Sequence, residues 1–283
     1  MSNPIQPVPV SVVPDDRPVE VVVISHSPLF YWWPVWVVGF LMALLTYLRG
    51  YQVAFVPPGT VAERGVRVEG QDGPRDVLIA PAGQPLPTTP EPEDLKQPRL
   101  RMLASNDPGI IWATTLCAVI LLSQVPLRGL WSLVLLIVLV FTTVLLAVLG
   151  LWDPIVRAVR VVDIHITGSS YLAISVFLFA LWLVTFLFFD RQVYMIFTRG
   201  QLRVRAAVSQ GETVYDTRGI VVERHRDDLF RHWLLGFGSG DLTVRTGGPS
   251  PQQLQWPNVL GIRGKLKLIH TMLQEREVVR APR

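Results

Sequence analysis

Four long apolar runs without a single charged residue constrain the fold of this chain more than any other feature. They occupy residues 29–48, 110–127, 130–152 and 168–189 and are 18 to 23 residues long. A helix rising 1.5 Å per residue needs about 20 residues to cross a hydrocarbon core of about 30 Å. Each run therefore has the length and the composition of a transmembrane helix.

The alternative is a bundle of buried helices in a soluble protein, which would show a polar stripe with a period near 3.6 residues. The runs show no such stripe. Half of the 283 residues are hydrophobic and only 17% are charged, whereas soluble domains carry about 25% charged residues. This composition excludes a disordered chain and disfavours an ordinary cytosolic enzyme. We therefore predict a multi-pass membrane protein with four spans.

The N-terminal segment 1–28 is rich in proline, lacks a basic start and carries Asp15, Asp16 and Glu20. These features are not those of a cleaved signal peptide. They predict an extended, solvated tail, followed by a first span that acts as an uncleaved anchor.

The loop 49–107 has β-forming residues between glycine and proline breakers in its first part. This pattern predicts a small β-rich subdomain near the membrane. Six prolines between residues 81 and 98 are typical of a semi-rigid spacer. A solvated connector with little structure is the alternative for the whole loop.

The segment 153–167 begins with Asp153 and Pro154, a pattern of a helix N-cap followed by proline at the first helical position. Arg157 and Arg160 then lie three residues apart among apolar residues. This spacing predicts a short helix lying in the membrane interface with both arginines towards phosphates. A simple membrane-proximal turn is the alternative.

The C-terminal region 190–283 has 15 basic and 9 acidic residues, so the basic excess of the chain lies there. Its pattern predicts an α+β fold. Strands are expected at 192–198 and 202–208, a third strand bent near Gly219 is expected within 213–224, and a helical turn at 229–235 follows. Two further strands at 241–246 and 254–256 precede a helix from about 258 to 276.

Four motifs in this region lie at 194–202, 220–222, 229–238 and 242–246. The most specific one is an apolar helical turn ending in Leu235-Gly236-Phe237-Gly238, followed by a strand that ends in Arg245-Thr246. These residues resemble the bacterial pleckstrin-homology-like (PH-like) family, in the membrane-tethered form called the second bacterial PH domain. The resemblance covers about 192–274. It implies a bent antiparallel β-sheet capped by a C-terminal helix, on the cytoplasmic side of a transmembrane segment, with no catalytic residues.

We find no residue pattern that predicts catalysis, a cofactor or a metal site. The five histidines have no metal-binding spacing, so we interpret them as isolated surface residues. His225-Arg226-Asp227 lacks the other kinase motifs, and the glycines at 236–240 follow a helical turn rather than a strand. Cys117 is the only cysteine, which excludes an intrachain disulfide. We therefore expect no enzyme.

Basic residues offer one set of candidate contacts with lipid headgroups. Arg203 and Arg205 share one face of a predicted strand, and Lys265 and Lys267 lie on the final helix. Each basic residue near an anionic leaflet contributes about 1 kcal/mol of attraction. An ordinary solvated basic surface is the alternative. Nucleic-acid binding is not predicted, because the basic excess is modest and not interleaved with aromatic residues.

These observations predict a non-enzymatic interaction or scaffold protein of a bacterial cell membrane, with unidentified membrane or cytoplasmic protein partners. Sheet edges and the loop 247–253 are its candidate partner surfaces. The spans carry no ionisable residue of the kind that transporters place in their pathways. The alternative is therefore an accessory subunit of a transport complex whose polar pathway belongs to another chain. Four spans place both termini on one side, and the resemblance favours the cytoplasm.

Overall fold

The computed structural model describes residues 20–70, 72–84, 100–124, 129–205, 211–225, 228, 230–247 and 251–280, the last six without their side chains. The chain forms two compact units, which we describe one at a time. The first comprises Met1–Tyr31, Leu122–Leu139 and Trp182–Arg283, and the second comprises Trp32–Leu121 and Val140–Leu181. Most of the predicted proline-rich spacer and residues 1–19 of the predicted tail lie outside the described residues.

Among the described residues, four helices are long and apolar enough to cross a membrane, as predicted: Pro28–Arg49, Asp107–Gln124, Leu130–Val148 and Gly168–Gln192. The first consists of the 3-10 turn η1 (Pro28–Trp32) and α1 (Trp33–Arg49), with proline in its first turn. The second and third are α2 (Asp107–Gln124) and α3 (Leu130–Val148). The fourth runs from α5 (Gly168–Val184) through η3 (Thr185–Phe189) into η4 (Asp190–Gln192).

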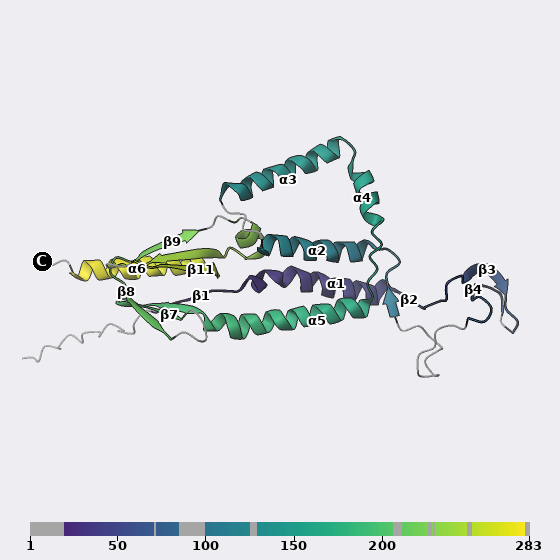
Figure 1. Cartoon of the computed structure of the whole chain (residues 1–283), viewed down its shortest axis with the longest axis horizontal. Helices are drawn as coiled ribbons and strands as arrows, with labels where there is room; N and C mark the ends of the chain where they lie inside the picture. Colours follow the sequence, from purple (N-terminus) through teal and green to yellow (C-terminus); the bar gives the residue numbers. More distant parts are fainter. Residues whose placement is uncertain are drawn as a thin grey trace, which may run out of the picture. The chain divides into compact units, whose positions relative to one another are not determined.

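In the second unit, α1, α2 and α5 run side by side (Figure 1) around a core of large apolar side chains. Trp112 of α2 donates its indole N–H to the backbone oxygen of Val35, at 3.3 Å. Gly39 allows α1 to approach α5 closely, because a Cβ atom there would lie 2.0 Å from Ser175 Oγ. The buried core residues are Val35, Ala43, Trp112, Val119 and Tyr171.

The third predicted span is shorter than expected. It ends at Val148 instead of residue 152, because Gly150 adopts a left-handed conformation (φ 65°) that stops the helix. The next helix, α4 (Trp152–Arg160), begins one residue before the predicted N-cap, so Asp153 lies in its first turn and not at the cap. A short helix therefore exists where one was predicted.

The described parts of the loop after α1, residues 50–70, 72–84 and 100–106, contain four short strands in two separate pairs. β2 (Tyr51–Val53) pairs antiparallel with β5 (Leu100–Met102), and β3 (Val61–Arg67) pairs with β4 (Pro74–Ile79). Most side chains of β3 and β4 are exposed on both faces. The loop therefore has local β-structure but its strands form only two-stranded pairs.

The first unit contains two antiparallel sheets and a long helix. The four-stranded sheet has the order β1-β6-β7-β8, and the three-stranded sheet has the order β11-β10-β9. The strands are β1 (Val21–Ile24), β6 (Tyr194–Phe197), β7 (Gln201–Arg205), β8 (Thr213–Asp216), β9 (Val221–His225), β10 (Gly240–Arg245) and β11 (Gln253–Val259).

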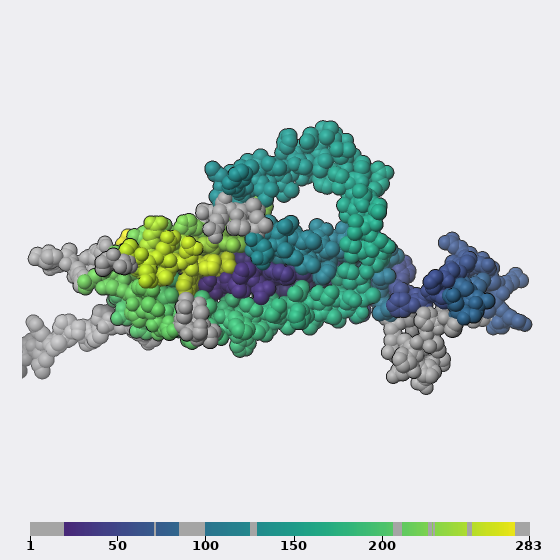
Figure 2. All heavy atoms as spheres, viewed as in Figure 1, coloured from purple at the N-terminus to yellow at the C-terminus, as the bar shows by residue number. Residues whose placement is uncertain are grey.

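The helix α6 (Ile262–Arg280) lies against these strands, as the yellow and green atoms in Figure 2 show. Its Ile262 and Ile269 pack with Leu202 and Val204 of β7 and with Leu242 of β10. The alternation of β7 explains this packing, since Leu202 and Val204 point to the core while Arg203 is exposed. The helix therefore covers the inner face of the four-stranded sheet.

Two expectations for this region are corrected. Residues 21–24, expected to belong to a solvated tail, form β1 instead, in register with β6 from Val21 opposite Phe197 to Ile24 opposite Tyr194. The single bent strand expected within 213–224 is two strands, of which β8 pairs with β7 and β9 with β10. Gly219 (φ 67°) allows the turn between them.

Candidate functional site

A buried group of polar side chains joins the segment before α1, the end of the fourth apolar helix and the three-stranded sheet. We call it the junction network. All of its members belong to the first unit. They are His26, Tyr31, Asp190, Arg231, His232, Ser239, Asp241 and Asn258.

Tyr31 lies at the centre of this network. The turn η1 places its side chain in a core with Phe30 and Leu235, where it is fully buried. Its hydroxyl donates to Asn258 Oδ1 at 2.7 Å and lies 3.4 Å from Ser239 Oγ. The guanidinium of Arg231 lies 6.0 Å from the centre of the ring, at the limit of a cation–π contact.

Asn258 connects this tyrosine to the segment before α1. Its side-chain amide donates to the backbone oxygen of His26, at 2.8 Å. Asn258 has a φ of 56°, a left-handed conformation that asparagine tolerates better than most residues. The conformation therefore suits an asparagine at this bend, and its amide joins two segments 232 residues apart.

His26 and Asp190 form a buried pair. His26 Nδ1 lies 3.0 Å from Asp190 Oδ2, and the backbone N–H of Ser27 donates to Asp190 Oδ1 at 3.1 Å. The rings of Phe30 and Phe186 flank the imidazole, with centroids 5.4 and 5.2 Å away. The pair therefore links the residues before α1 to the end of the fourth helix within an aromatic environment.

Three nitrogen atoms lie within 3.5 Å of the carboxylate of Asp241 in β10. Arg231 Nη2 donates to its Oδ2 at 2.9 Å, the backbone N–H of Asn258 donates to its Oδ1 at 3.0 Å, and His232 Nε2 lies 3.5 Å from Oδ1. Burial by itself would raise the pKa of Asp241. The hydrogen bonds from His232 and Asn258 and the charges of His232 and Arg231 outweigh burial and lower the pKa below its usual value.

Ser239, His232 and Asp241 lie in a row that resembles a serine hydrolase triad in composition. His232 Nδ1 lies 3.2 Å from Ser239 Oγ, and its Nε2 faces Asp241. Ser239 is fully buried, however, and Tyr31 lies against its hydroxyl. A nucleophile must reach a substrate carbonyl, so this row is better suited to holding the junction together.

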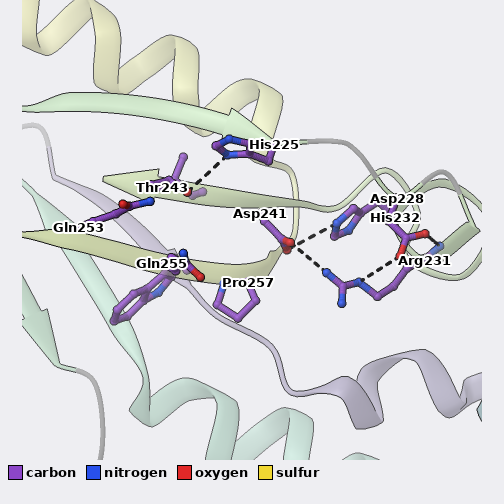
Figure 3. A pocket seen from close by; sticks show the side chains of 11 residues that line it. His225, Asp228, Arg231, His232, Asp241, Thr243, Gln253, Gln255 and Pro257 are labelled. Carbon is purple, nitrogen blue, oxygen red and sulfur yellow. Dashed lines mark hydrogen bonds and ion pairs between the residues drawn. The ribbon is translucent and has the colours of Figure 1, made fainter. Parts of the chain in front are cut away.

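A polar pocket of about 310 Å³ opens beside the network (Figure 3). Figure 3 shows Asp241 pointing towards His232 and Arg231, with Gln253, Gln255 and Pro257 of β11 on the other side. Asp228 Oδ2 and Trp256 Nε1 line this region and are buried with no hydrogen-bond partner among the described residues, although Asp228 Oδ2 lies 4.0 Å from Arg231 Nε. Such groups are normally satisfied by water or a ligand, so the pocket has the chemistry to hold small polar molecules.

The four basic residues predicted to contact lipid headgroups do not form one surface. Arg203 is exposed on the outer face of the four-stranded sheet, with Arg205 two residues further along the strand. Lys265 and Lys267 belong to α6, which packs on the opposite face of that sheet. Burial lowers the pKa of Lys265, whereas Lys267 is exposed. The structure therefore divides the predicted set into two separate pairs.

The interpretation of the histidines as surface residues is wrong for two of them. His26 and His232 are both buried. The partner of His26, Asp190, is 164 residues away, so spacing alone could not reveal that pair. Ser239 lies seven residues after His232, but at no spacing typical of a known motif. The sequence signal that could have indicated this site is the position of His26 and Tyr31 at the start of an apolar run. Among the described residues, no three His, Cys, Asp or Glu side chains are arranged to hold a metal ion.

No protein-family model, curated protein or solved structure matches this chain. The site must therefore be interpreted from its own geometry.

Proposed function

We propose that this chain is a multi-pass protein of a bacterial cell membrane that presents a PH-like domain to the cytoplasm as a non-enzymatic interaction or scaffold module. The observation that carries the proposal is the pairing of β1 with β6. Because of this pairing, the four-stranded sheet contains one strand from before the apolar helices in the sequence and three strands from after them.

This pairing has a consequence for membrane topology. β1 ends four residues before the first apolar helix, and β6 begins two residues after the last one. Two strands that leave the membrane on opposite sides cannot reach each other, because a strand with unpaired backbone groups would have to enter the hydrocarbon, which is too costly. β1 and β6 must therefore lie on the same side. The number of crossings between them must be even, which supports four spans.

The two-sheet arrangement supports the PH-like resemblance. Four and three antiparallel strands enclose one apolar core, and a C-terminal helix packs across it. Antiparallel strands followed by a terminal helix are also what the resemblance implies. The departure is that β1, which comes from before the apolar helices in the sequence, supplies a strand of the four-stranded sheet.

The junction network supports a role in which the domain is held rigidly at the membrane. A flexible linker would allow a tethered domain to move freely, and few buried contacts would be needed. Here His26 and Asp190 pair at the two helix ends, and Tyr31 and Asn258 connect them to the sheet. A rigid mount positions the exposed sheet face for a partner.

Two measurements test the proposal. In a Cys117→Ala background, a cysteine at exposed position 214 should be labelled by a membrane-impermeant maleimide only after cells are opened. A photo-crosslinker at the same position should then capture a defined protein, and Arg203→Glu, opposite Val214 on the same sheet face, should abolish capture. Labelling of intact cells would overturn the orientation, and unchanged capture by the glutamate variant would overturn the sheet face as the partner surface.

An accessory role in a transport complex is the second candidate, and α3 is the observation that favours it. Along Leu130–Val148 nearly all large apolar side chains are exposed, and Ser132 is the buried residue. A span with so many exposed apolar side chains can pack against another membrane protein. A crosslinker at Ile137 or Phe141 that captures a polar multi-span permease, independently of Arg203→Glu, would favour this role.

A further inference from the structure

The segment after β9 exposes an unusual set of apolar side chains. The short π-helix η5 (Phe230–Leu235) and the turn after it leave Trp233, Leu234 and Phe237 exposed by 74, 52 and 69%. Soluble domains seldom expose a tryptophan, a leucine and a phenylalanine so close together without a partner. We call these three residues the η5 patch.

Leu235, which lies between these exposed residues in the sequence, shows where the patch lies relative to the apolar helices. Leu235 is buried with Phe30 and Tyr31, where the first apolar helix begins, and Trp182, Phe186 and Leu122 pack on this cluster. Trp182 and Phe186 lie near the end of the fourth helix, and Leu122 near the end of the second. The η5 segment therefore lies where three of the apolar helices enter or leave the bilayer.

The backbone conformation of Phe237 indicates that the exposure of its ring is functional. Its φ is 49°, and a bulky side chain rarely occupies the left-handed region unless the surroundings enforce it. Backbone strain of this kind is concentrated at functional positions. The conformation presents the ring to the outside instead of the core that Leu235 fills.

A hollow next to the patch contains a basic residue. Trp233, Phe237 and Arg263 line it together with glycines, and its volume is about 540 Å³. Aromatic rings with a nearby arginine are the composition that proteins place at headgroup depth, where rings meet the acyl boundary and cations meet phosphates.

We propose that Trp233, Leu234 and Phe237 insert into the interfacial layer of the phospholipid leaflet next to the domain, with the Arg263 guanidinium at the level of the phosphates. The occupant is the bilayer itself. Continuity with the helix ends favours lipid over a soluble protein, because the patch and the spans share one apolar cluster through Leu235. This inference rests on the proposed membrane insertion of the four helices.

The test uses full-length protein in vesicles of phosphatidylcholine and phosphatidylglycerol. In a Cys117→Ala background, single cysteines replace Trp233 or Phe237 and carry an environment-sensitive fluorophore. Leu268, exposed on α6, is the matched control for a surface position in the same domain, and Val176, exposed on α5, is the control for a position within a span.

We expect the labels at 233 and 237 to emit at shorter wavelength than the label at 268 and to be protected from aqueous iodide. A nitroxide near the lipid headgroup should quench them more than one at the acyl-chain end, with the opposite order at 176. Labels at 233 and 237 that behave like the label at 268, while 176 stays in hydrocarbon, would overturn this inference alone. If 176 is also in water, membrane insertion itself fails.

Discussion

The two ends of the first apolar helix use the same kinds of contact but differ in burial. At its start, β1 pairs with β6 and His26 pairs with Asp190, with side chains only 8% and 5% exposed. At its end, β2 pairs with β5, and Asp107 lies 3.2 Å from Arg160 with both side chains about half exposed. An exposed ion pair contributes about 0–1 kcal/mol, whereas loss of one partner from a buried pair costs about 3–5 kcal/mol.

The comparison indicates that only the first end is built to hold the molecule together. A strand pair and a His–Asp pair are costly to break where apolar groups exclude water, as Phe30 and Phe186 do around His26, because the remaining partner would stay buried without its contact. The same pairings in water connect chain segments without fixing them. The predictions below test this difference from the largest expected effect to the smallest.

Val23 on the inner face of β1 is the most sensitive position. Val23→Asp places a charge in the core shared by both sheets, where Val23 is fully buried. We expect a loss of more than about 4 kcal/mol, which is exceptional for one substitution. Val22→Asp, one residue away on the outer face, should change stability by about 0.5 kcal/mol or less. Thermal unfolding in mild detergent measures both, and equal effects would contradict the placement of β1.

Asp190→Ala removes the acceptor of His26 and of the Ser27 backbone N–H. We expect a loss of about 3 kcal/mol, since two donors remain buried without a partner. The matched variant Asp107→Ala at the other end should cost about 0–1 kcal/mol. Unfolding midpoints in the same detergent compare the two. The interpretation fails if Asp107→Ala is the more destabilising change.

Tyr31→Phe deletes only the hydroxyl that donates to Asn258. The buried Asn258 oxygen then lacks its short hydrogen bond, which should cost about 1–3 kcal/mol. Tyr47→Phe on α1 is the control, because Tyr47 is exposed, and its effect should stay within about 0.5 kcal/mol. Hydrogen exchange of β11 would show whether the loss is local to the junction.

Asp241 should make the domain sensitive to acid. Because its pKa is lowered in the fold from an ordinary value of 3.8, the ionised form is favoured by folding. Its contribution is complete above that value and is lost as the pH falls through the lowered pKa. Asp241→Asn should therefore reduce the loss of stability as the pH falls below about 3.8. Unfolding midpoints of the parent protein and of Asp241→Asn across this pH range measure the difference, and equal losses would contradict the prediction.

The sequence was sufficient to predict the helices and most strands of the C-terminal region, because apolar runs and alternation depend on local composition. It was not sufficient for β1, since Val21 to Ile24 follow a proline-rich segment and pair with strand β6, at residues 194 to 197. Pairing partners are not encoded in local periodicity.

The site was less predictable than the fold. Arg203 and Lys265 were grouped by charge, yet α6 packs on the side of the sheet that Arg203 faces away from. His26 and Asp190 carry no motif, because their proximity follows from two helix ends meeting at one sheet. The exposure of Trp233 and Phe237 likewise depends on which neighbour, Leu235, fills the core.

The most direct test of the account is a disulfide between β1 and β6. In a Cys117→Ala background, cysteines at Val22 and Ile196 lie directly opposite each other in the register. Mild oxidation of membranes should form an intrachain disulfide in this variant, and form it far more slowly when the second cysteine is at Arg203, one strand further away. No crosslink between 22 and 196, or a crosslink only between two chains, would contradict a domain built from both sides of the helical region.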